Sequence, residues 1–474
     1  MKYEAVIGLE VHAQLLTETK IFCGCSTKFG SEPNTQTCPI CIGMPGVLPV
    51  LNRKAVEYIV RTGLALGCDI SSHSRFARKN YFYPDLPKGY QISQFELPLC
   101  ENGYLDVSSD EGTRRINLTR IHLEEDAGKN IHEGSVNNSF VDLNRAGVSL
   151  MEIVSEPDIR RPHEAVEFVK KIREIVRYIG VCDGNMEQGS LRCDANVSVR
   201  PEGQSEYGVK AEIKNMNSFK FIESAVEYEI YRQIKTLKEG GKIIQETRLW
   251  NTERGITESM RSKEGSHDYR YFPDPDLMPV NLDSGWIDKL RNETGELPEV
   301  RRNRYAADYA MSEEDAFLLT ADRHTSEWFE KAVLAGCDPK VTVNWIKGDL
   351  MRLLNEDGRQ ISDCPLNPVH LAGMLDLVKK GTISGKIAKT VFEEMYRTGN
   401  DAETVVREKG LVQMSDESGL ETIIDEILAN SPGEIERFRA GDQKLMGFFV
   451  GQVMKNTGGK ANPKIVNELL RKKL

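Results

Sequence analysis

Three stretches of alternating polar and apolar residues carry acidic, basic and imidazole side chains at a spacing suited to nucleotide binding. In residues 6–14 the two-residue period of a β-strand places Glu10, His12 and Gln14 on one face, with apolar residues on the other. Carboxylates bind Mg²⁺ and basic side chains neutralise phosphates, so such a face is suited to phosphate chemistry. A solvated sheet face is the alternative, because periodicity does not show that the strands meet. The same period recurs in residues 190–200 and 209–214, with polar faces made of Arg192, Asp194, Asn196, Ser198, Arg200, Lys210, Glu212 and Lys214.

Further acidic residues occur in the run Glu124-Glu125-Asp126-Ala-Gly-Lys129, and again at Glu152 and Glu156. The common phosphate loop Gly-x-x-x-x-Gly-Lys-[Ser/Thr] does not occur in the sequence, and neither does the nucleophile motif Gly-x-Ser-x-Gly. If ATP binds, it therefore binds on a sheet face through a metal ion.

Four cysteines form two close pairs, Cys23-Gly-Cys25 and Cys38-Pro-Ile-Cys41, which are separated by twelve residues. Short spacings of this kind let two turns supply the four soft ligands that tetrahedral zinc prefers. Because all four positions are sulfur, the predicted zinc has no open position for water and is structural. Reduced structural cysteines and a redox-active Cys-Pro-Ile-Cys pair are the alternatives.

The whole chain has the composition of a globular protein. Its 474 residues predict two or three domains, and 39% hydrophobic and 28% charged residues are ordinary for this class. No apolar run is long enough to span a bilayer, and the N-terminus lacks the pattern of a signal peptide, so we expect a cytoplasmic protein with no membrane contact. The net charge of -10 argues against non-specific coating of nucleic acid.

The elements that position these residues divide the chain into three predicted parts. Residues 1–293 are rich in strands, with helices expected at 53–66, 163–179 and 220–238. Residues 294–408 have the pattern of a helical domain. Residues 409–474 form a smaller helical tail, in which apolar stripes predict helices at 420–428 and 442–455.

The C-terminus is the basic region of this acidic chain. From residue 437 onward it has nine basic and two acidic residues, around the turn Gly458-Gly459. A solvated basic helix face and a nucleic-acid contact are the two interpretations. The candidate contacts are Lys444, Lys455, Lys460, Lys464, Arg471, Lys472 and Lys473.

Ten motifs, spread in order over the whole chain, together resemble one family, the B subunit of the glutamyl/aspartyl-tRNA amidotransferase. They are Val6-Ile-Gly-Leu-Glu10-Val-His12, Arg78-Lys-Asn-Tyr-Phe-Tyr-Pro-Asp85, Tyr90-Gln-Ile-Ser-Gln94, Glu124-Glu-Asp-Ala-Gly-Lys129, Glu152-Ile-Val-Ser-Glu-Pro-Asp158, Gly189-Ser-Leu-Arg-Cys-Asp-Ala-Asn196, Glu212-Ile-Lys-Asn215, Asp268-Tyr-Arg-Tyr-Phe-Pro273, Met446-Gly-Phe-Phe-Val-Gly-Gln452 and Lys460-Ala-Asn-Pro463.

This resemblance implies an α+β protein: a large sheet-based cradle domain with a glutamine-synthetase-like ATP site, an all-α helical domain and a small α-helical tail that contacts tRNA. ATP would phosphorylate the side-chain carboxylate of Glu or Asp misacylated to tRNA(Gln) or tRNA(Asn), and ammonia would then displace the phosphate. The resemblance also implies a heterotrimer, in which an amidase (glutaminase) subunit supplies ammonia from glutamine and a third, small subunit would brace the pair.

The resemblance also suggests roles for the polar residues. We expect Glu10, His12, Glu125 and Asp194 to bind Mg²⁺, with Glu152 and Glu212 as weaker candidates. His12 could orient a carboxylate instead of binding the metal. For the three basic residues Lys79, Lys129 and Arg192, structural ion pairs are the alternative to the roles given next. We expect Lys79 and Lys129 to contact the phosphate or the substrate carboxylate, and Arg192 to stabilise the negative charge that develops during the transfer. Tyr81, Tyr83 and Tyr90 are expected beside the aminoacylated end of the tRNA.

Two rival functions remain open at this point. One is a non-catalytic tRNA-binding scaffold, which would keep phosphoryl transfer when Glu10 or Glu125 is replaced. The other is a free-standing ligase for a small amino acid, which would act on free glutamate without tRNA; the basic tail argues against it.

Overall fold

The computed structural model describes residues 2–131, 138–260, 269–412, 417–458 and 461–474. The chain separates into two compact units, Met1–Pro298 and Glu299–Leu474, and each is described here by itself. Asp268, Gly459 and Lys460, which the sequence motifs and the basic tail include, lie outside the described residues.

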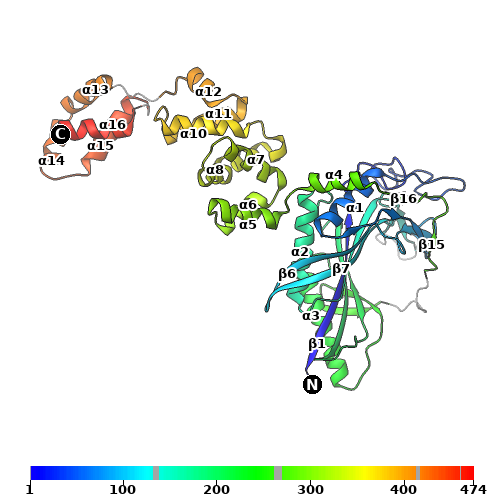
Figure 1. Cartoon of the computed structure of the whole chain (residues 1–474). Coiled ribbons are helices and arrows are strands. Elements are labelled where there is room, and N and C mark those ends of the chain that lie inside the picture. Colours follow the sequence, from blue (N-terminus) through cyan, green and yellow to red (C-terminus); the bar gives the residue numbers. More distant parts are fainter. Residues whose placement is uncertain (1, 132–137, 261–268, 413–416, 459–460) are drawn as a thin grey trace. The chain divides into compact units, whose positions relative to one another are not determined.

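A nine-stranded sheet organises the first unit, with β1 (Tyr3–Gln14) near its centre (Figure 1). Neighbouring strands are antiparallel, except that β12 and β13 are parallel. The strands predicted at 6–14, 190–200 and 209–214 are confirmed as β1, β11 and β12. The sheet order is β14 (Ile256–Ser259), β13 (Thr247–Asn251), β12 (Ala211–Lys214), β11 (Leu191–Pro201), β1, β10 (Ser149–Ser155), β7 (Gly112–Glu125), β6 (Cys100–Ser109) and β2 (Asp69–Ile70).

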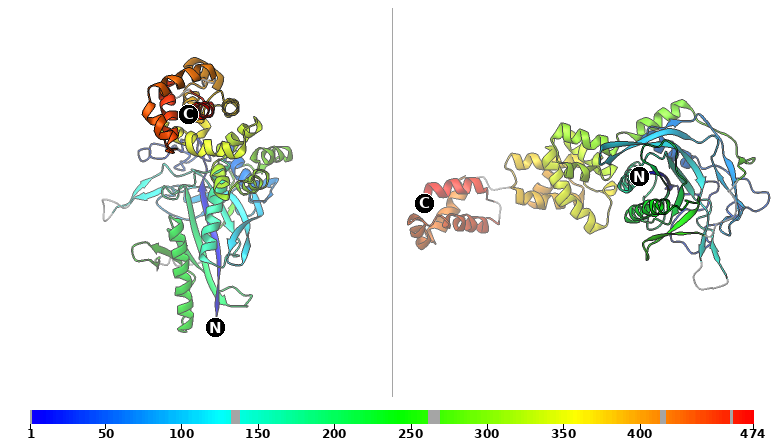
Figure 2. Two further views of the ribbon diagram at one scale, coloured as in Figure 1. Left: turned by 90° about the vertical axis from the view of Figure 1, so that its left-hand side faces the viewer. Right: turned by 90° about the horizontal axis from the view of Figure 1, so that it is seen from below.

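Three helices cover the apolar face of this sheet: α1 (Arg53–Ala65), α2 (Pro162–Tyr178) and α3 (Phe219–Lys238) (Figures 1 and 2). They confirm the three helices expected from the sequence. Ile7, Leu9 and Val11 of β1 are fully buried in the core that these helices complete. Each such aliphatic side chain contributes about 1.5–3 kcal/mol through burial. By alternation, Glu10 and His12 therefore lie on the opposite, polar face.

Smaller sheets and a further helix complete the first unit. A three-stranded sheet joins β4 (Ala77–Asn80) to β5 (Tyr90–Ser93) and β15 (Phe272–Pro273). Hydrogen bonds from Gln91 and Ile92 to Glu125 attach this sheet to the end of β7. The other elements are β3 (His73–Ser74) with β16 (Val280–Asn281), β8 (Lys129–Ile131) with β9 (Phe140–Asp142), and α4 (Ser284–Thr294).

The second unit is helical throughout its described residues and contains two separate hydrophobic clusters. The first cluster, within residues 305–406, is built from α5 (Pro298–Tyr309), α6 (Glu313–Thr320), α7 (Arg323–Leu334), α8 (Pro339–Trp345), the π-helical turn η1 (Ile346–Leu350), α9 (Met351–Asp357), the 3₁₀ turn η2 (Ile361–Asp363), α10 (Pro368–Lys379), α11 (Gly385–Thr398) and α12 (Ala402–Lys409).

The second cluster lies within residues 420–470 and confirms the helices expected at 420–428 and 442–455. Its helices are α13 (Glu417–Ala429), α14 (Pro432–Arg439), α15 (Leu445–Asn456) and α16 (Pro463–Lys473). A large sheet followed by a helical C-terminal region agrees with the α+β class expected from the sequence. In the described parts of the chain, no helix is long and apolar enough to cross a membrane.

Candidate active site

Three adjacent strands bring imidazole and carboxylate groups together on the polar face of the large sheet. The antiparallel register places His12 of β1 opposite Glu152 of β10, and Glu152 opposite His122 of β7. The Glu152 Oε2 atom lies 3.6 Å from His12 Nε2 and 3.3 Å from His122 Nε2. Glu124 completes this group, which we call the imidazole–carboxylate cluster, with its Oε2 3.8 Å from His122 Nε2.

The imidazole–carboxylate cluster is electrostatically coupled. Burial alone would raise the pKa of Glu152, but the imidazoles of His122 and His12 outweigh it and hold that pKa well below its usual value. Burial disfavours charged His122, yet Glu152 and Glu124 raise its pKa to about 9. One ligand atom each from His12, Glu124 and Glu152 lies within 4.8 Å of the others, so these three residues could hold a metal ion.

Lys79 of β4 places an ammonium group beside this cluster. Burial opposes its charge, but the negative charge of Glu124, with smaller contributions from nearby tyrosines and Glu152, raises the pKa of Lys79. Its Nζ lies 4.9 Å from the centre of the Tyr269 ring, a cation–π arrangement. The neighbouring Asn80 side chain donates hydrogen bonds to the Tyr269 carbonyl at 3.1 Å and the Arg270 carbonyl at 2.8 Å. These bonds fix a segment in which Arg270 has a left-handed φ of 44°, so the tyrosine is held against Lys79.

A second group of charges adjoins the cluster on β1, β11 and β12. Lys214 Nζ lies 2.6 Å from Asp194 Oδ2 and 2.8 Å from Glu212 Oε1. Glu10 accepts a hydrogen bond of 2.9 Å from Asn196 Nδ2. Burial raises the pKa of Glu10, and the carboxylates of Glu152 and Glu212 add to this. Glu10 therefore interacts electrostatically with the imidazole–carboxylate cluster, through Glu152, and with the second group, through Glu212.

Arg192 shares this strand face but is engaged in an ion pair. Its Nη2 donates to Asp126 Oδ2 at 2.9 Å, and Gln14 Nε2 donates to the same oxygen at 2.8 Å. Burial raises the pKa of Asp126, but Arg192 and Arg145 outweigh it, so that the pKa is lowered. The guanidinium therefore has at least a structural role.

The structure does not bring Glu125 or Lys129 into the imidazole–carboxylate cluster. Glu124 and Glu125 are consecutive in β7, so their side chains point to opposite sides of the sheet. Glu125 instead accepts hydrogen bonds from Lys88 Nζ at 2.6 Å and from the Ile92 amide at 2.8 Å. Lys129 is exposed at the start of β8, where it pairs in register with Asp142.

Sequence reasoning did not assign roles to His122 and Glu124, which the structure places at the centre of the site. The two-residue period of residues 118–125 puts them on one face, and this signal was readable. Their proximity to Glu152, about 30 residues away in the chain, and to His12, more than a hundred residues away, depends on strand register, which local periodicity does not determine.

The four cysteines Cys23, Cys25, Cys38 and Cys41 also converge, and we call them the four-cysteine cluster. Cys41 Sγ lies 3.6 Å from Cys23 Sγ, 3.7 Å from Cys38 Sγ and 3.8 Å from Cys25 Sγ. Four sulfurs placed about 2.3 Å from a tetrahedral zinc ion would be about 3.8 Å apart, so the cluster has the dimensions of such a site. The pKa of Cys41 is lowered, because Cys23 donates to it and Lys20 lies nearby.

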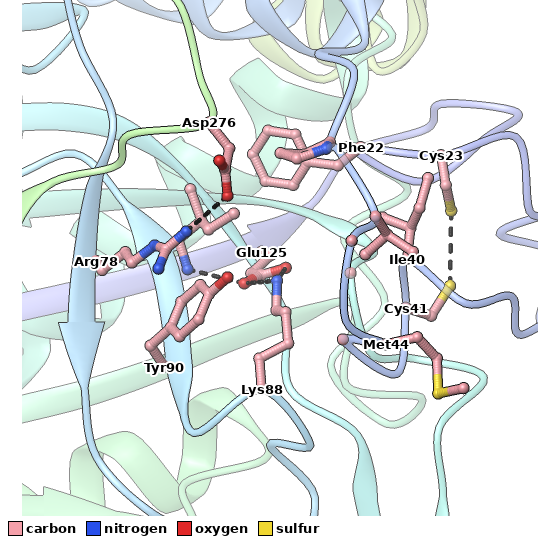
Figure 3. Close-up of a pocket in the computed structure, with 16 residues that line it drawn as sticks. Phe22, Cys23, Ile40, Cys41, Met44, Arg78, Lys88, Tyr90, Glu125 and Asp276 are labelled. Atoms are coloured by element: carbon pink, nitrogen blue, oxygen red, sulfur yellow. Dashed lines mark hydrogen bonds and ion pairs between the residues drawn. The ribbon is translucent and has the colours of Figure 1, made fainter.

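Residues of the four-cysteine cluster and the Lys88–Glu125 pair line one cavity of about 260 Å³ (Figure 3). Its lining includes Cys23, Cys41 and Gly43 together with Lys88 and Glu125. A Cβ atom on Gly43 would lie 2.5 Å from Lys88 Cγ, so the absence of a side chain permits this close approach. The cysteine turn therefore packs directly on Lys88.

Those candidate tRNA contacts that the structure describes lie on α15, on α16 and at the residue just before α15. Lys473 is partly buried and pairs with Asp425, with 2.7 Å between Nζ and Oδ1. The remaining described members are exposed: Lys444, Lys455, Lys464, Arg471 and Lys472.

Comparisons with known proteins match nearly the whole chain. The family model of the GatB/GatE catalytic domain matches residues 5–288, and that of the GatB domain matches residues 327–474. Several similar curated proteins are each named as the B subunit of aspartyl/glutamyl-tRNA(Asn/Gln) amidotransferase. Those from Thermodesulfovibrio yellowstonii and Geobacter sulfurreducens are 64% identical over 472 residues and 58% identical over 477 residues. The alignments cover 100% of this chain and 99% and 100% of those proteins, respectively.

Proposed function

The chain belongs to the GatB family, and from this premise we propose that it catalyses the ATP-dependent amidation of misacylated Glu-tRNA(Gln), Asp-tRNA(Asn) or both. The single observation that carries this proposal is the convergence of His12, Glu124 and Glu152 from three strands beside Lys79. In this proposal residues 1–293 form the catalytic cradle with a glutamine-synthetase-like ATP site. Residues 294–408 form a helical domain, and residues 409–474 form the tRNA-contacting tail.

The chemistry requires an activated carboxyl group. A carboxylate is a poor electrophile, because direct attack by ammonia would have to expel oxide. Transfer of the γ-phosphoryl group of ATP to the side-chain carboxylate gives an acyl phosphate and ADP. Ammonia then attacks the acyl carbon, the C–O bond to phosphate breaks, and the products are the amide and inorganic phosphate after loss of a proton.

The residues of the polar face fit the charges of this reaction. His12, Glu124 and Glu152 would hold Mg²⁺, although an imidazole is a less usual ligand for this hard cation than an oxygen. Mg²⁺ would supply positive charge between the phosphate groups. Lys79, whose partly buried ammonium is in electrostatic contact with Glu124 and Glu152, would bind the transferred phosphoryl group. The adjoining groups of the same face are Glu10, Arg192, Asp194 and Glu212.

We place the reaction in the cytoplasm and in a heterotrimer. An amidase subunit would hydrolyse glutamine to supply ammonia, and a small subunit would brace the assembly. Purification of the chain with these partners, followed by ATP- and glutamine-dependent conversion of each misacylated tRNA, tests the proposal. Conversion of free glutamate at a comparable rate would instead support a free-standing ligase.

The tail is proposed to contact the tRNA backbone, and charge removal tests this. Replacing Lys464, Arg471 and Lys472 by glutamine is expected to weaken tRNA binding. The slope of log K against log[salt] should become shallower by about two units, because a protein with fewer phosphate contacts releases fewer counterions when it binds. Filter binding from low to high salt gives the slope. The matched control replaces three exposed lysines of the other helical cluster, Lys331, Lys340 and Lys386. Equal slopes in both triple variants would contradict the tail assignment.

We also propose that Cys23, Cys25, Cys38 and Cys41 hold a structural zinc ion. The sulfur separations of 3.6–3.8 Å around Cys41 support this assignment. With four sulfur ligands, no position on the metal is open to substrate.

A further inference from the structure

Lys20 is among the largest fully buried side chains of the molecule, with only 1% of its surface exposed. Lysine is almost never fully buried without a partner, because removing its ammonium from water is costly. No carboxylate of the described residues lies within 4.0 Å of Lys20 Nζ, so an ordinary salt bridge does not compensate for this burial in the part of the chain that is described. The charge of Lys20 needs another partner.

The Lys20 ammonium points to the four-cysteine cluster. Its Nζ lies 3.5 Å from Cys41 Sγ and 3.2 Å from the Leu143 carbonyl oxygen. The backbone amide of Lys20 also donates to the Cys25 carbonyl at 3.0 Å, so the residue touches both cysteine pairs. Neutral thiols would be weak acceptors for a buried ammonium, whereas thiolates bound to a metal provide the missing negative charge.

We propose that Lys20 is the internal cation of the four-cysteine metal site: it donates an N–H···S hydrogen bond to Cys41 and partly neutralises the metal-bound thiolates. This inference rests on the proposed zinc site. Zn²⁺ with four thiolates has a net charge of about −2, and one buried ammonium halves it. Lys20 is a positioning residue, because it acts on the metal through its ligand.

The second contact of Lys20 links the metal site to the polar face of the sheet. Leu143 belongs to a segment that also holds the loop between the cysteine pairs, since the Leu143 amide donates to Asn34 Oδ1 at 2.8 Å. Two residues later, Arg145 donates to the Gly128 carbonyl at 2.6 Å and lies 3.7 Å from Asp126 Oδ2. Asp126 is the ion-pair partner of Arg192. Lys20 is therefore one of the contacts, together with Asn34, that attach the metal site to the segment that supports this pair.

Metal competition on the full-length chain tests the inference. Lys20→Met removes the charge at nearly constant length, and its zinc affinity is expected to fall about 10–100-fold, as measured by transfer to a chromogenic chelator. Lys28→Met is the matched control, because Lys28 is exposed in the same cysteine loop, and its affinity is expected to stay within about twofold of wild type. Cobalt substitution should show the same thiolate-to-metal absorption band in both variants, since the four ligands remain.

The outcomes separate the two proposals. Zinc-free wild-type protein that also fails to bind added zinc or cobalt would contradict the metal site itself. Equal affinities for wild type and Lys20→Met would overturn the role of Lys20 while leaving the metal site intact. If Lys20→Met does not fold, Lys20→Arg and Lys20→Gln replace it. The charged variant is then expected to bind zinc at least about 10-fold more tightly than the neutral one, and equal affinities would overturn the inference.

Discussion

Glu124→Gln is expected to lower ATP-dependent amidation by about 10³-fold while leaving the fold intact. The Glu124 carboxylate is 3% exposed and accepts a hydrogen bond of 3.2 Å from Ser93 Oγ, and glutamine preserves its shape and this acceptor. The substitution removes a negative charge that the proposed Mg²⁺ and the ammonium of Lys79 require. Turnover of misacylated tRNA by the assembled complex, with thermal unfolding as a check on folding, measures the effect.

Two other glutamates of the same sheet make this experiment specific. Glu101→Gln changes an exposed residue of β6 and is expected to leave turnover unchanged. Glu125→Gln leaves the partly buried Lys88 without its charged partner, so it is expected to lower stability without raising the Mg²⁺ concentration needed for half-maximal rate. Glu124→Gln is expected to raise that concentration. Wild-type turnover and Mg²⁺ dependence in Glu124→Gln would favour the non-catalytic scaffold.

Cys38→Ser is expected to release the metal and to destabilise the first unit. A serine hydroxyl is a poor zinc ligand, and metal binding free energy contributes directly to folding where the site forms only in the folded chain. We expect loss of the stoichiometric zinc of the wild type and a fall in Tm of several degrees or more, measured by elemental analysis and calorimetry.

Cys364→Ser is the matched control, because Cys364 is a partly exposed cysteine of the second unit, outside the four-cysteine cluster. The Cys364→Ser variant should have the zinc content and the Tm of the wild type. If Cys38→Ser has the same metal content and Tm as wild type, the four sulfurs are not a metal site. Rapid proteolysis between residues 26 and 37 in Cys38→Ser alone would show that the metal orders this loop.

The sequence was most informative about features that depend on near neighbours in the chain. The period of β1 correctly placed Glu10 and His12 on one face, and the helix expected at 163–179 is present as α2. Close cysteine spacings also indicated the cluster that the structure contains. In each case the signal lies within one element or one pair of turns.

The rest of the site depends on pairing between distant segments. The register of β7 against β10 is needed to identify Glu124, and not Glu125, as the member of the imidazole–carboxylate cluster. A shift of one residue would exchange the two faces. The contact of Tyr269 with Lys79 joins residues 190 positions apart and depends on the side chain of Asn80. Burial of Lys20 had no local signal, since a single lysine is normally solvated whatever its neighbours in the chain.

The position of β1 between β10 and β11 has a consequence for how the gene can change. The same strand supplies the fully buried Ile7, Leu9 and Val11 to the core and Glu10 and His12 to the polar face. Deletion of one codon within β1 would turn part of the charged set toward α1–α3 and the matching aliphatic set toward the polar face. Such a chain would lose its core together with its chemistry. We therefore expect length variation among descendants of this gene to be tolerated in its loops and to be absent from β1.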